Sequence, residues 1–470
     1  MAEETQLDPV IDATACTSRA VERVGQPLWQ LELAGHSAMH FQQIAGGRTV
    51  TGNTLAQIAA SMIALVTLVT LVLRHGGTSP TKARLVLAQG ETVFATHGED
   101  STRTRHLRDA LARYDAHAKP ILIPGRPTAA LGEAAHRFDP VGSIAGAHYI
   151  RPLSLATTLA SLPRAVALLA SGIGETSRYA APLGFRDRLA IAFRMALGAA
   201  HARWWCNATG GLQIRHALFA HTGTGDLSQL EQAMQHTGTR TVHLVHGTNI
   251  GWAFAGLSDV AVFPSGADAR LGARLPAYGT CTHLPLKRPE VSPGNGDWAL
   301  LTSYTHLQHP AFATTGSQPD CELVRWVSRA ADRLGQDPAR IFWRPHPQIE
   351  LVPAAERERL EATVAQAGFT RWPDTLPYAA LGEFSAAVTT PSTVLTDGLR
   401  LGQPMIVASL TPLQHDLLYA DHPLLVEDEA RLHDAIVRVL DPKRRAQAFS
   451  GAWAAMEPGD HLQLTDCFAL

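Results

Sequence analysis

The feature that most limits the possible folds is a repeated alternation between short apolar runs and longer segments with helical periodicity. The runs lie at residues 83–88, 119–124, 217–220, 241–247, 259–263, 298–303, 341–343, 386–389 and 405–408. The helical segments lie at 102–118, 155–205, 227–236, 321–334, 353–367 and 394–401. Strands that alternate with helices form a parallel sheet with helices on both faces. We therefore predict an α/β fold, with residues 83–88 as one of its strands.

A cluster of proline and glycine divides this alternation into two halves. Pro285, Pro289, Pro293, Gly294 and Gly296 lie within twelve positions, and 470 residues are many for one hydrophobic core. We predict an extension with an apolar helix (1–80), an N-terminal α/β domain (81–285), a C-terminal α/β domain (297–445) and a tail (446–470). Two doubly wound parallel sheets would leave a ligand cleft between them, at the carboxyl ends of their strands.

Composition excludes several classes of protein. A formal net charge of −2 gives no general attraction to nucleic acid. The five cysteines, Cys16, Cys206, Cys281, Cys321 and Cys467, are scattered and show no CxxC spacing, which favours reduced thiols in the cytoplasm. The chain has 22 histidines but no HExxH motif, so we expect no metal site. The polar first thirty residues do not resemble a signal peptide.

One apolar run, residues 58–73, raises the question of a membrane. It is shorter than the ~20 residues that a spanning helix needs. No collar of lysine and arginine surrounds it. We favour a buried helix or strand, and leave open a segment that lies in the membrane interface or a true span.

Two motifs in the second half place polar groups at strand ends. Arg344-Pro345-His346-Pro347 follows one apolar run, and Thr390-Pro391-Ser392-Thr393 follows another and opens a helix. A helix N-terminus carries unpaired N–H groups and partial positive charge, so hydroxyl groups there suit a phosphate. An imidazole on a neighbouring loop can protonate a departing phosphate oxygen. The two motifs together indicate a nucleotide-phosphate leaving group.

These motifs, with His246-Gly247 at the end of an earlier strand and Gly402-Gln403-Pro404 after the helix, resemble bacterial glycosyltransferases of the GT-B fold. The chain is most similar to the CDP-glycerol glycerophosphotransferase group and to the capsule polymerases, including polysialyltransferases. The likeness covers roughly residues 215–410. It implies a GT-B-like fold and a metal-independent transferase without a cofactor.

The resemblance also implies a reaction. A sugar would move from a CMP-, CDP- or UDP-linked donor to a bacterial surface glycan, such as capsule or lipopolysaccharide, or to a lipid-linked glycan. The enzyme would act in the cytoplasm, and a peripheral position at the inner membrane stays open. Residues 81–285 would form the acceptor domain and residues 297–445 the nucleotide-donor domain. Two alternatives stay open: transfer of a polyol phosphate such as glycerophosphate on the same scaffold, and a GT-B module that binds glycan or nucleotide without turnover.

By this resemblance, His346 lies at the donor phosphates and helps the nucleotide to leave, and His246 acts in catalysis or acceptor binding. Polysialyltransferases carry an acidic pair followed by glycine as the source of a general base. Here the nearest equivalent, Glu99 and Asp100, follows a glycine instead. Both carboxylates are candidates for the base, and ordinary solvated loop residues are the alternative.

Donor binding is assigned to Arg344, Ser392, Thr393 and Asp397. Arg344 would neutralise phosphate or serve the fold, and Asp397 would approach the ribose or base. Ser392 and Thr393 would donate to the phosphate, and plain N-capping of the helix is the alternative for both.

A competing motif, Arg74-His75-Gly76-Gly77-Thr78, follows the apolar run. It is similar to the signature of histidine phosphatases, in which the histidine attacks phosphorus. In that family the motif follows the first strand, and the apolar run before it here is too long for that strand.

Overall fold

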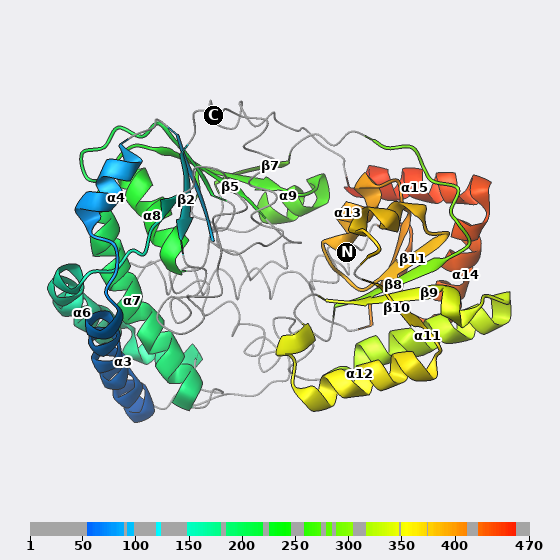
Figure 1. The fold of residues 1–470 in the computed structure, drawn as a ribbon, viewed down its shortest axis with the longest axis horizontal. Helices are drawn as coiled ribbons and strands as arrows, with labels where there is room; N and C mark the ends of the chain where they lie inside the picture. The colour runs from blue at the N-terminus through cyan, green and yellow to red at the C-terminus, as the bar shows by residue number, and fades with distance from the viewer. Residues whose placement is uncertain are drawn as a thin grey trace.

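The computed structural model describes residues 54–88, 92–97, 119–123, 148–179, 185–219, 225–245, 258–273, 279–283, 288–303, 316–346, 349–373, 375–410 and 422–456. The strands of these residues form two parallel sheets, one in each half of the chain. Figure 1 shows the two sheets side by side, each with its own helices. The predicted α/β class with two doubly wound parallel sheets is confirmed.

The first sheet has seven strands in the order β3-β2-β1-β4-β5-β6-β7. They are β1 (Thr92–His97), β2 (Lys119–Ile123), β3 (His148–Tyr149), β4 (His216–Phe219), β5 (Arg240–Leu244), β6 (Val260–Phe263) and β7 (Thr280–His283). The helices of this half are α3 (Thr54–His75), α4 (Pro80–Leu87), α6 (Leu155–Tyr179), α7 (Phe185–Thr209), α8 (Gly225–His236) and α9 (Gly266–Ala273). We call this half the N-terminal unit.

The second sheet has six strands in the order β10-β9-β8-β11-β12-β13. They are β8 (Trp298–Thr302), β9 (Ile341–Pro345), β10 (Thr370–Arg371), β11 (Ala386–Thr389), β12 (Met405–Ala408) and β13 (Leu425–Val426). Its helices are α11 (Gln318–Leu334), α12 (Ala354–Gln366), α13 (Val394–Arg400), α14 (Glu429–Leu440) and α15 (Pro442–Met456), with 3₁₀ turns η4 (Pro338–Arg340), η5 (Ile349–Leu351) and η6 (Tyr378–Glu383). We call this half the C-terminal unit.

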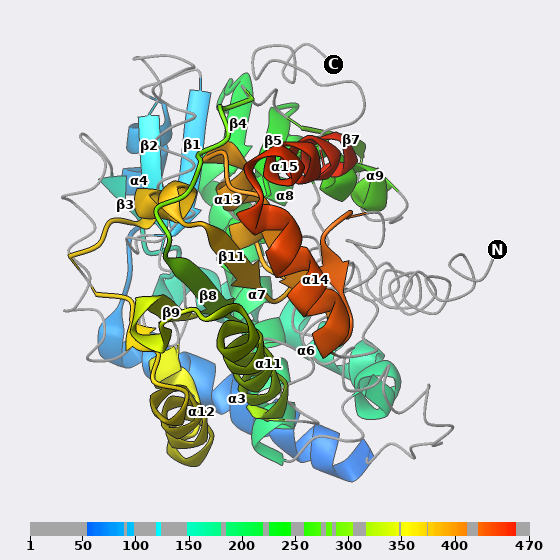
Figure 2. The ribbon, with the colours of Figure 1, turned by 90° about the vertical axis from the view of Figure 1, so that its right-hand side faces the viewer.

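Alternation along the strands explains why both faces of the second sheet are covered. In β8, Trp298 and Leu300 pack into a core with α11, α12 and α14. Ala299 and Leu301 point to the other face and pack with α13 and α15. Figure 2 shows the sheet between these helices. A strand buried on both faces needs a continuous apolar run, which is why β8 was visible in the sequence.

Helix α15 crosses the boundary at residue 445 that separated the predicted C-terminal domain from its tail. Its Phe449, Ala452 and Met456 are buried in the same core as β8 and β11. Residues 446–456 therefore belong to the C-terminal unit. The other predicted boundaries, and the cleft between the domains, stay predictions.

The prediction of a strand at residues 83–88 is wrong, because these residues form most of helix α4. The Ser79 hydroxyl accepts a hydrogen bond of 3.2 Å from the Lys82 N–H, and Pro80 occupies the first helical turn. A serine cap before a proline is a strong helix start signal. It outweighs the apolar run that follows it.

The apolar run 58–73 is a helix with one buried face, as part of α3. Ala60, Ala64, Leu68 and Val72 are buried against α6 and α7. Because α3 begins at Thr54 and ends at His75, it is longer than the run that we noted, and it is long and apolar enough to cross a membrane. The phosphatase interpretation fails here, since its motif follows a helix and not a strand.

The two units touch through α9 of the N-terminal unit. Its Ala267 packs into the core formed by α13 and α15. The Arg270 guanidinium donates to the Ala455 carbonyl of α15 at 3.2 Å, and Arg400 of α13 donates to the Pro264 carbonyl at 3.4 Å. Pro264 directly follows β6, so the carboxyl end of that strand lies next to α13.

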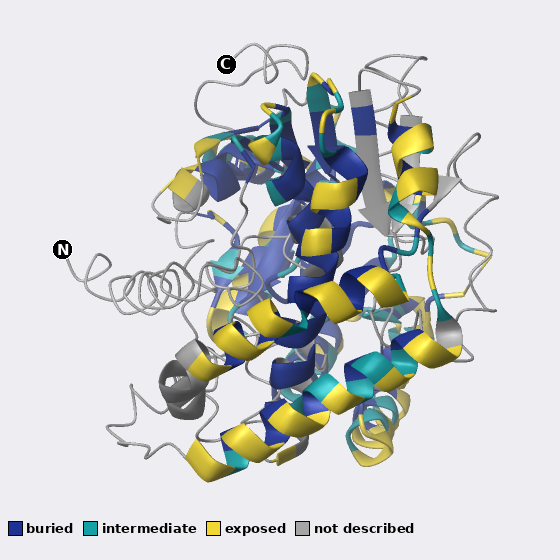
Figure 3. Cartoon of the chain, turned by 90° about the vertical axis from the view of Figure 1, so that its left-hand side faces the viewer, coloured by how far each residue is buried: buried dark blue, intermediate teal, exposed yellow. Residues whose placement is uncertain are grey.

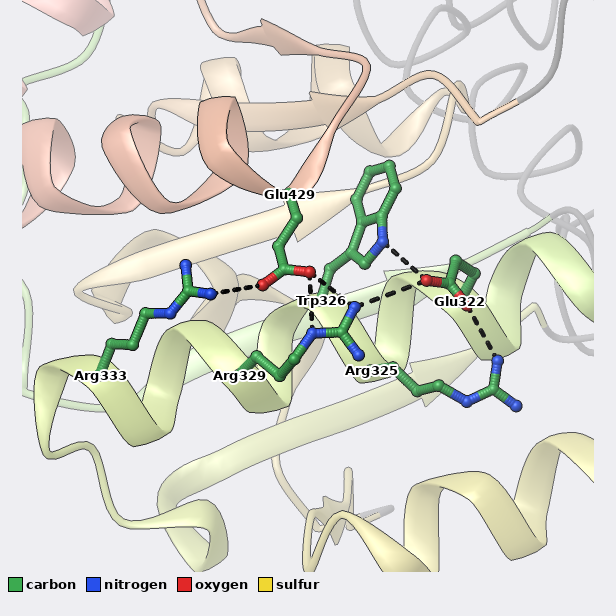
Figure 4. A network of polar contacts seen from close by, with 6 residues as sticks. All are labelled: Glu322, Arg325, Trp326, Arg329, Arg333 and Glu429. Atoms are coloured by element: carbon green, nitrogen blue, oxygen red, sulfur yellow. Dashed lines mark hydrogen bonds and ion pairs between the residues drawn. The ribbon is translucent and has the colours of Figure 1, made fainter.

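A surface network joins α11 to the start of α14 (Figure 4). The Glu429 carboxylate accepts hydrogen bonds of 2.8 Å from Arg329 and 2.9 Å from Arg333. Glu322 accepts one of 2.9 Å from the Trp326 indole. The arginines are well exposed, so each pair contributes less than about 1 kcal/mol to stability. The network orients α14 more than it stabilises it.

Candidate functional site

The predicted donor motifs lie at the point where the strand order of the second sheet reverses. The chain runs from β8 to β9 on one side and returns to β11 on the other. The register pairs Thr302 with Pro345 and Leu301 with Thr389. The Arg344-Pro345-His346 turn and the Thr390–Ser392 turn therefore leave the same sheet edge on either side of β8, about 10 Å apart. In open parallel sheets, ligands bind at this position.

Between the two turns lies Ser303, which the motifs did not single out. Its Oγ is 2.6 Å from Thr390 Oγ1, and its N–H donates to the same Thr390 oxygen at 2.9 Å. Its Oγ also lies 3.3 Å from the Pro391 carbonyl. Ser303 is only partly buried, whereas Thr390 is fully buried. The signal available in the sequence was the hydroxyl pair Thr302-Ser303 at the end of an otherwise apolar run.

Arg344 is held between two aromatic rings. Its guanidinium carbon is 5.4 Å from the Trp372 ring centre and 4.5 Å from the Tyr378 ring centre. Such cation–π contacts stabilise the cation and fix its orientation. Arg344 thus serves the fold of the loop and places a positive charge at the end of β9, and its role in neutralising phosphate stays a prediction.

Asp397 belongs to a chain of polar contacts. Its carboxylate accepts a hydrogen bond of 3.2 Å from the Tyr378 hydroxyl and lies 3.6 Å from the Arg400 guanidinium. Arg400 in turn reaches the Pro264 carbonyl in the N-terminal unit. Asp397 therefore links Tyr378, whose ring lies against the Arg344 guanidinium, to Arg400 and its contact with the N-terminal unit.

The side chains of Ser392 and Thr393 make at most weak capping hydrogen bonds with the residues described. The Ser392 Oγ accepts a long hydrogen bond of 3.4 Å from the Val394 N–H. Thr393 stands at the N-cap position of α13, and its side chain makes no capping hydrogen bond with the residues described. Both residues are partly exposed. Helix α13 ends at Arg400, and Gly402, with a φ of +77°, turns the chain toward β12, which starts at Met405.

His346 leaves β9 at the sheet edge, next to Arg344. Its backbone carbonyl accepts a hydrogen bond of 2.9 Å from the Ile349 N–H, which closes the turn after the strand. Its side chain is partly exposed. The structure thus brings together His346, Arg344, Ser303 and Ser392 around the end of β8.

The other predicted catalytic residues, His246, Glu99 and Asp100, lie outside the described residues. In the sequence, Glu99 and Asp100 follow β1, which ends at His97, and His246 follows β5 by two positions. The strand order of the first sheet reverses between β1 and β4. In the sequence, Glu99 and Asp100 thus come shortly after β1, the strand at which the order of the first sheet reverses.

Comparison with known proteins gives remote structural neighbours only. No protein-family model matches the chain, and no curated protein matches it. Similar solved structures include a UDP-forming α,α-trehalose-phosphate synthase from Burkholderia vietnamiensis, 10% identical with a TM-score of 0.44 over 77% of this chain and 95% of that chain. A UDP-forming synthase from Burkholderia xenovorans is 10% identical, with a TM-score of 0.43 over 78% and 95%. TcCGT1 in complex with UDP is 8% identical, with a TM-score of 0.38 over 77% and 93%. These values assign the chain to none of these enzymes.

Proposed function

We propose that the chain is a glycosyltransferase that moves a sugar from a CMP-, CDP- or UDP-linked donor to a bacterial surface glycan such as capsule or lipopolysaccharide. The observation that carries the proposal is that Arg344, His346, Ser303 and Ser392 lie at or just after the carboxyl ends of β9, β8 and β11, at one edge of the sheet. A permanent cation, a titratable imidazole and several hydroxyls at one sheet edge form a set of groups that suits a diphosphate or phosphodiester.

Each group has a distinct task in this proposal. Arg344 compensates the negative charge that grows on the leaving phosphate, and its aromatic partners keep it in place. His346 donates a proton or hydrogen bond to the same phosphate. Ser392 and Thr393 donate hydroxyl hydrogen bonds that hold the nucleotide. The acceptor hydroxyl would lose its proton to a base supplied by the N-terminal unit, with Glu99, Asp100 and His246 as the candidates.

The setting of the reaction is also a proposal. An acceptor that is a growing surface glycan, or its lipid-linked precursor, is available at the cytoplasmic face of the inner membrane, where nucleotide-activated sugars are present. Neither nucleic acid nor a resident cofactor takes part.

The first experiment identifies the donor. The full chain is heated with CMP, CDP, UDP and a purine nucleotide as a control, because a ligand that binds the folded state raises the melting temperature. The proposal expects one pyrimidine nucleotide to stabilise the protein. Ser392→Ala should reduce that stabilisation, whereas Ser450→Ala at a partly exposed position of α15, where the hydroxyl accepts from Arg288, should keep it.

The second experiment separates an enzyme from a binding module. Release of free nucleotide from its sugar conjugate is followed before and after a glycan acceptor is added. Acceptor-dependent release supports a transferase, and analysis of the product distinguishes a transferred sugar from a transferred polyol phosphate. Stabilisation by a nucleotide without any release would leave a binding module and overturn the proposal.

A further inference from the structure

Helix α3 buries one side and exposes the other. Its outer side carries large apolar residues with high exposed fractions: Leu55 79%, Met62 61%, Val66 66% and Leu73 63%, with Ile58 and Ile63 also exposed. They recur along the whole 22-residue helix. Exposed apolar residues are ordinary when scattered, but a continuous stripe marks a surface that meets another apolar phase.

Helix α6 extends this stripe. It packs beside α3 in the same core, and its Leu155, Leu159 and Val166 are exposed. Figure 3 views this side of the molecule and shows exposed residues along both helices. We call the exposed residues of α3 and α6 together the apolar face: Leu55, Ile58, Met62, Ile63, Val66, Leu73, Leu155, Leu159 and Val166.

The hydroxyl groups on the outer side of α3 fit an apolar surrounding. Thr67 and Thr70 donate to the Ile63 and Val66 carbonyls of their own helix, at 2.8 and 2.9 Å. A hydroxyl that is satisfied within its own helix loses little when water is removed from it. Water is therefore not required along this side.

The charged residues of segments 54–88 and 148–174, which carry the apolar face, are basic. Residues 54–88 and 148–174 contain neither aspartate nor glutamate, although the whole chain has a formal net charge of −2. Arg74, Lys82, Arg84 and Arg164 are exposed in these segments. A basic and apolar surface complements an anionic lipid bilayer. A second copy of this chain is less suitable, because pairing two apolar faces would bring like charges together.

The packing of α3 decides how it would meet the bilayer. Its inner side holds the core with α6 and α7, and the buried Ser61 donates to the Gln57 carbonyl at 2.8 Å. If α3 spanned the membrane, its inner side would leave this core. The apolar residues of that side and the Ser61–Gln57 contact would then be exposed. We propose that the apolar face lies flat on an anionic phospholipid bilayer, with the side chains of α3 and α6 in the headgroup region and the exposed arginines and lysine at the phosphates.

The test measures binding of the full chain to vesicles, without donor or acceptor. Its outcome is therefore separate from that of the transferase proposal. Vesicles of phosphatidylcholine alone and with added phosphatidylglycerol are sedimented with the protein. We expect binding to the anionic vesicles that weakens in high salt. Combining Ile58→Glu, Met62→Glu and Val66→Glu should lower the partition coefficient about tenfold or more. Leu440→Glu, an exposed leucine of α14 in the C-terminal unit, should leave it unchanged.

A second variant guards against loss of the fold. Combining Arg74→Gln and Arg164→Gln alters no apolar side chain and should also reduce binding to anionic vesicles about tenfold. Circular dichroism and gel filtration check all variants. Unchanged vesicle binding in both folded variants would overturn the proposal. So would a wild-type chain that ignores vesicles and forms a dimer that the triple variant abolishes, because a second copy would then cover the face.

Discussion

Ser303 Oγ and Thr390 Oγ1 lie 2.6 Å apart and join the ends of two neighbouring strands, β8 and β11. Both residues stand where the strand order of the second sheet reverses. The bond fixes the turn that leads into Ser392 and Thr393. The hydroxyls proposed to hold the donor therefore start from a turn that is anchored to the centre of the sheet.

Replacing Ser303 should weaken nucleotide binding. Ser303→Ala removes the hydroxyl contact to Thr390, and loss of one hydrogen bond costs about 1 kcal/mol, or about fivefold in affinity. Titration calorimetry with the nucleotide found by thermal shift measures this change. Ser450→Ala is the matched control on α15. Full affinity in folded Ser303→Ala would show that the pair does not support the binding turn.

Replacing His346 should affect turnover. His346→Ala should lower the turnover number at least ~100-fold, which corresponds to about 2.7 kcal/mol of transition-state stabilisation. Steady-state kinetics with saturating donor measures this, and a melting curve confirms the fold. A folded variant with turnover close to wild type removes the imidazole from the mechanism.

We expect the C-terminal unit to bind the nucleotide and the N-terminal unit to take part in transfer. Ser392→Ala and Thr393→Val should each weaken nucleotide binding by about 1–3 kcal/mol, because hydrogen bonds to a charged phosphate are lost. His246→Ala should leave nucleotide affinity nearly unchanged and depress transfer. Calorimetry and kinetics on the three variants separate these effects. The reverse pattern would mean that the N-terminal unit holds the nucleotide.

Activity should not require a divalent metal ion. The chain has no Asp-x-Asp pair, and the proposed site uses Arg344, His346 and hydroxyls where other transferases use a cation. Transfer measured after treatment with EDTA should equal the untreated rate. Complete loss that magnesium or manganese restores would contradict this expectation.

A buried carboxyl group in the N-terminal unit should make stability depend on pH. Burial, with a smaller contribution from nearby Asp259, raises the pKa of Glu231 to about 8 from 4.5, although its hydrogen bond from Ser258 lowers it. The folded state thus binds the proton more tightly than the unfolded state. The resulting stabilisation is complete below pH 4.5 and is lost as the pH rises from 4.5 to about 8.

Glu231→Gln tests this dependence, since the amide can still accept from Ser258 and does not titrate. Melting temperatures of the wild type should fall across this pH window, and those of Glu231→Gln should fall less, by an amount equivalent to a few kcal/mol. Glu358→Gln, at an exposed position of α12, is the control and should follow the wild type. Parallel curves for wild type and Glu231→Gln would refute the assignment.

Much of the fold could be predicted because its strands are buried on both faces. The strands β8, β11 and β12 appear as short apolar runs, since α/β packing leaves them no solvent-exposed side. The same rule misled at residues 83–88, where an apolar run lies in a helix. There the local signal of Ser79 and Pro80 should have taken precedence.

The site could be predicted only in part. The order of the motifs indicated that Arg344 and Ser392 share a sheet edge, because parallel strands end together. The order of the motifs does not predict which residues far apart in the sequence contact one another. The stacking of Arg344 on Trp372 and Tyr378 depends on tertiary packing, as does the reach of Arg400 to Pro264. Ser303 was missed because polar residues at the end of a strand are common.

One buried side chain near the end of the chain has a consequence for biosynthesis. Arg445 of α15 donates to the carbonyls of Ser292, Phe384, Ser385 and Val439 and to the Gln403 side chain. These acceptors come from four separate stretches of the C-terminal unit. Since a ribosome makes residue 445 after all of them, their partner is missing until α15 has been synthesised. The C-terminal unit therefore cannot complete these hydrogen bonds before α15 has left the ribosome, by which time the whole N-terminal sheet has been synthesised.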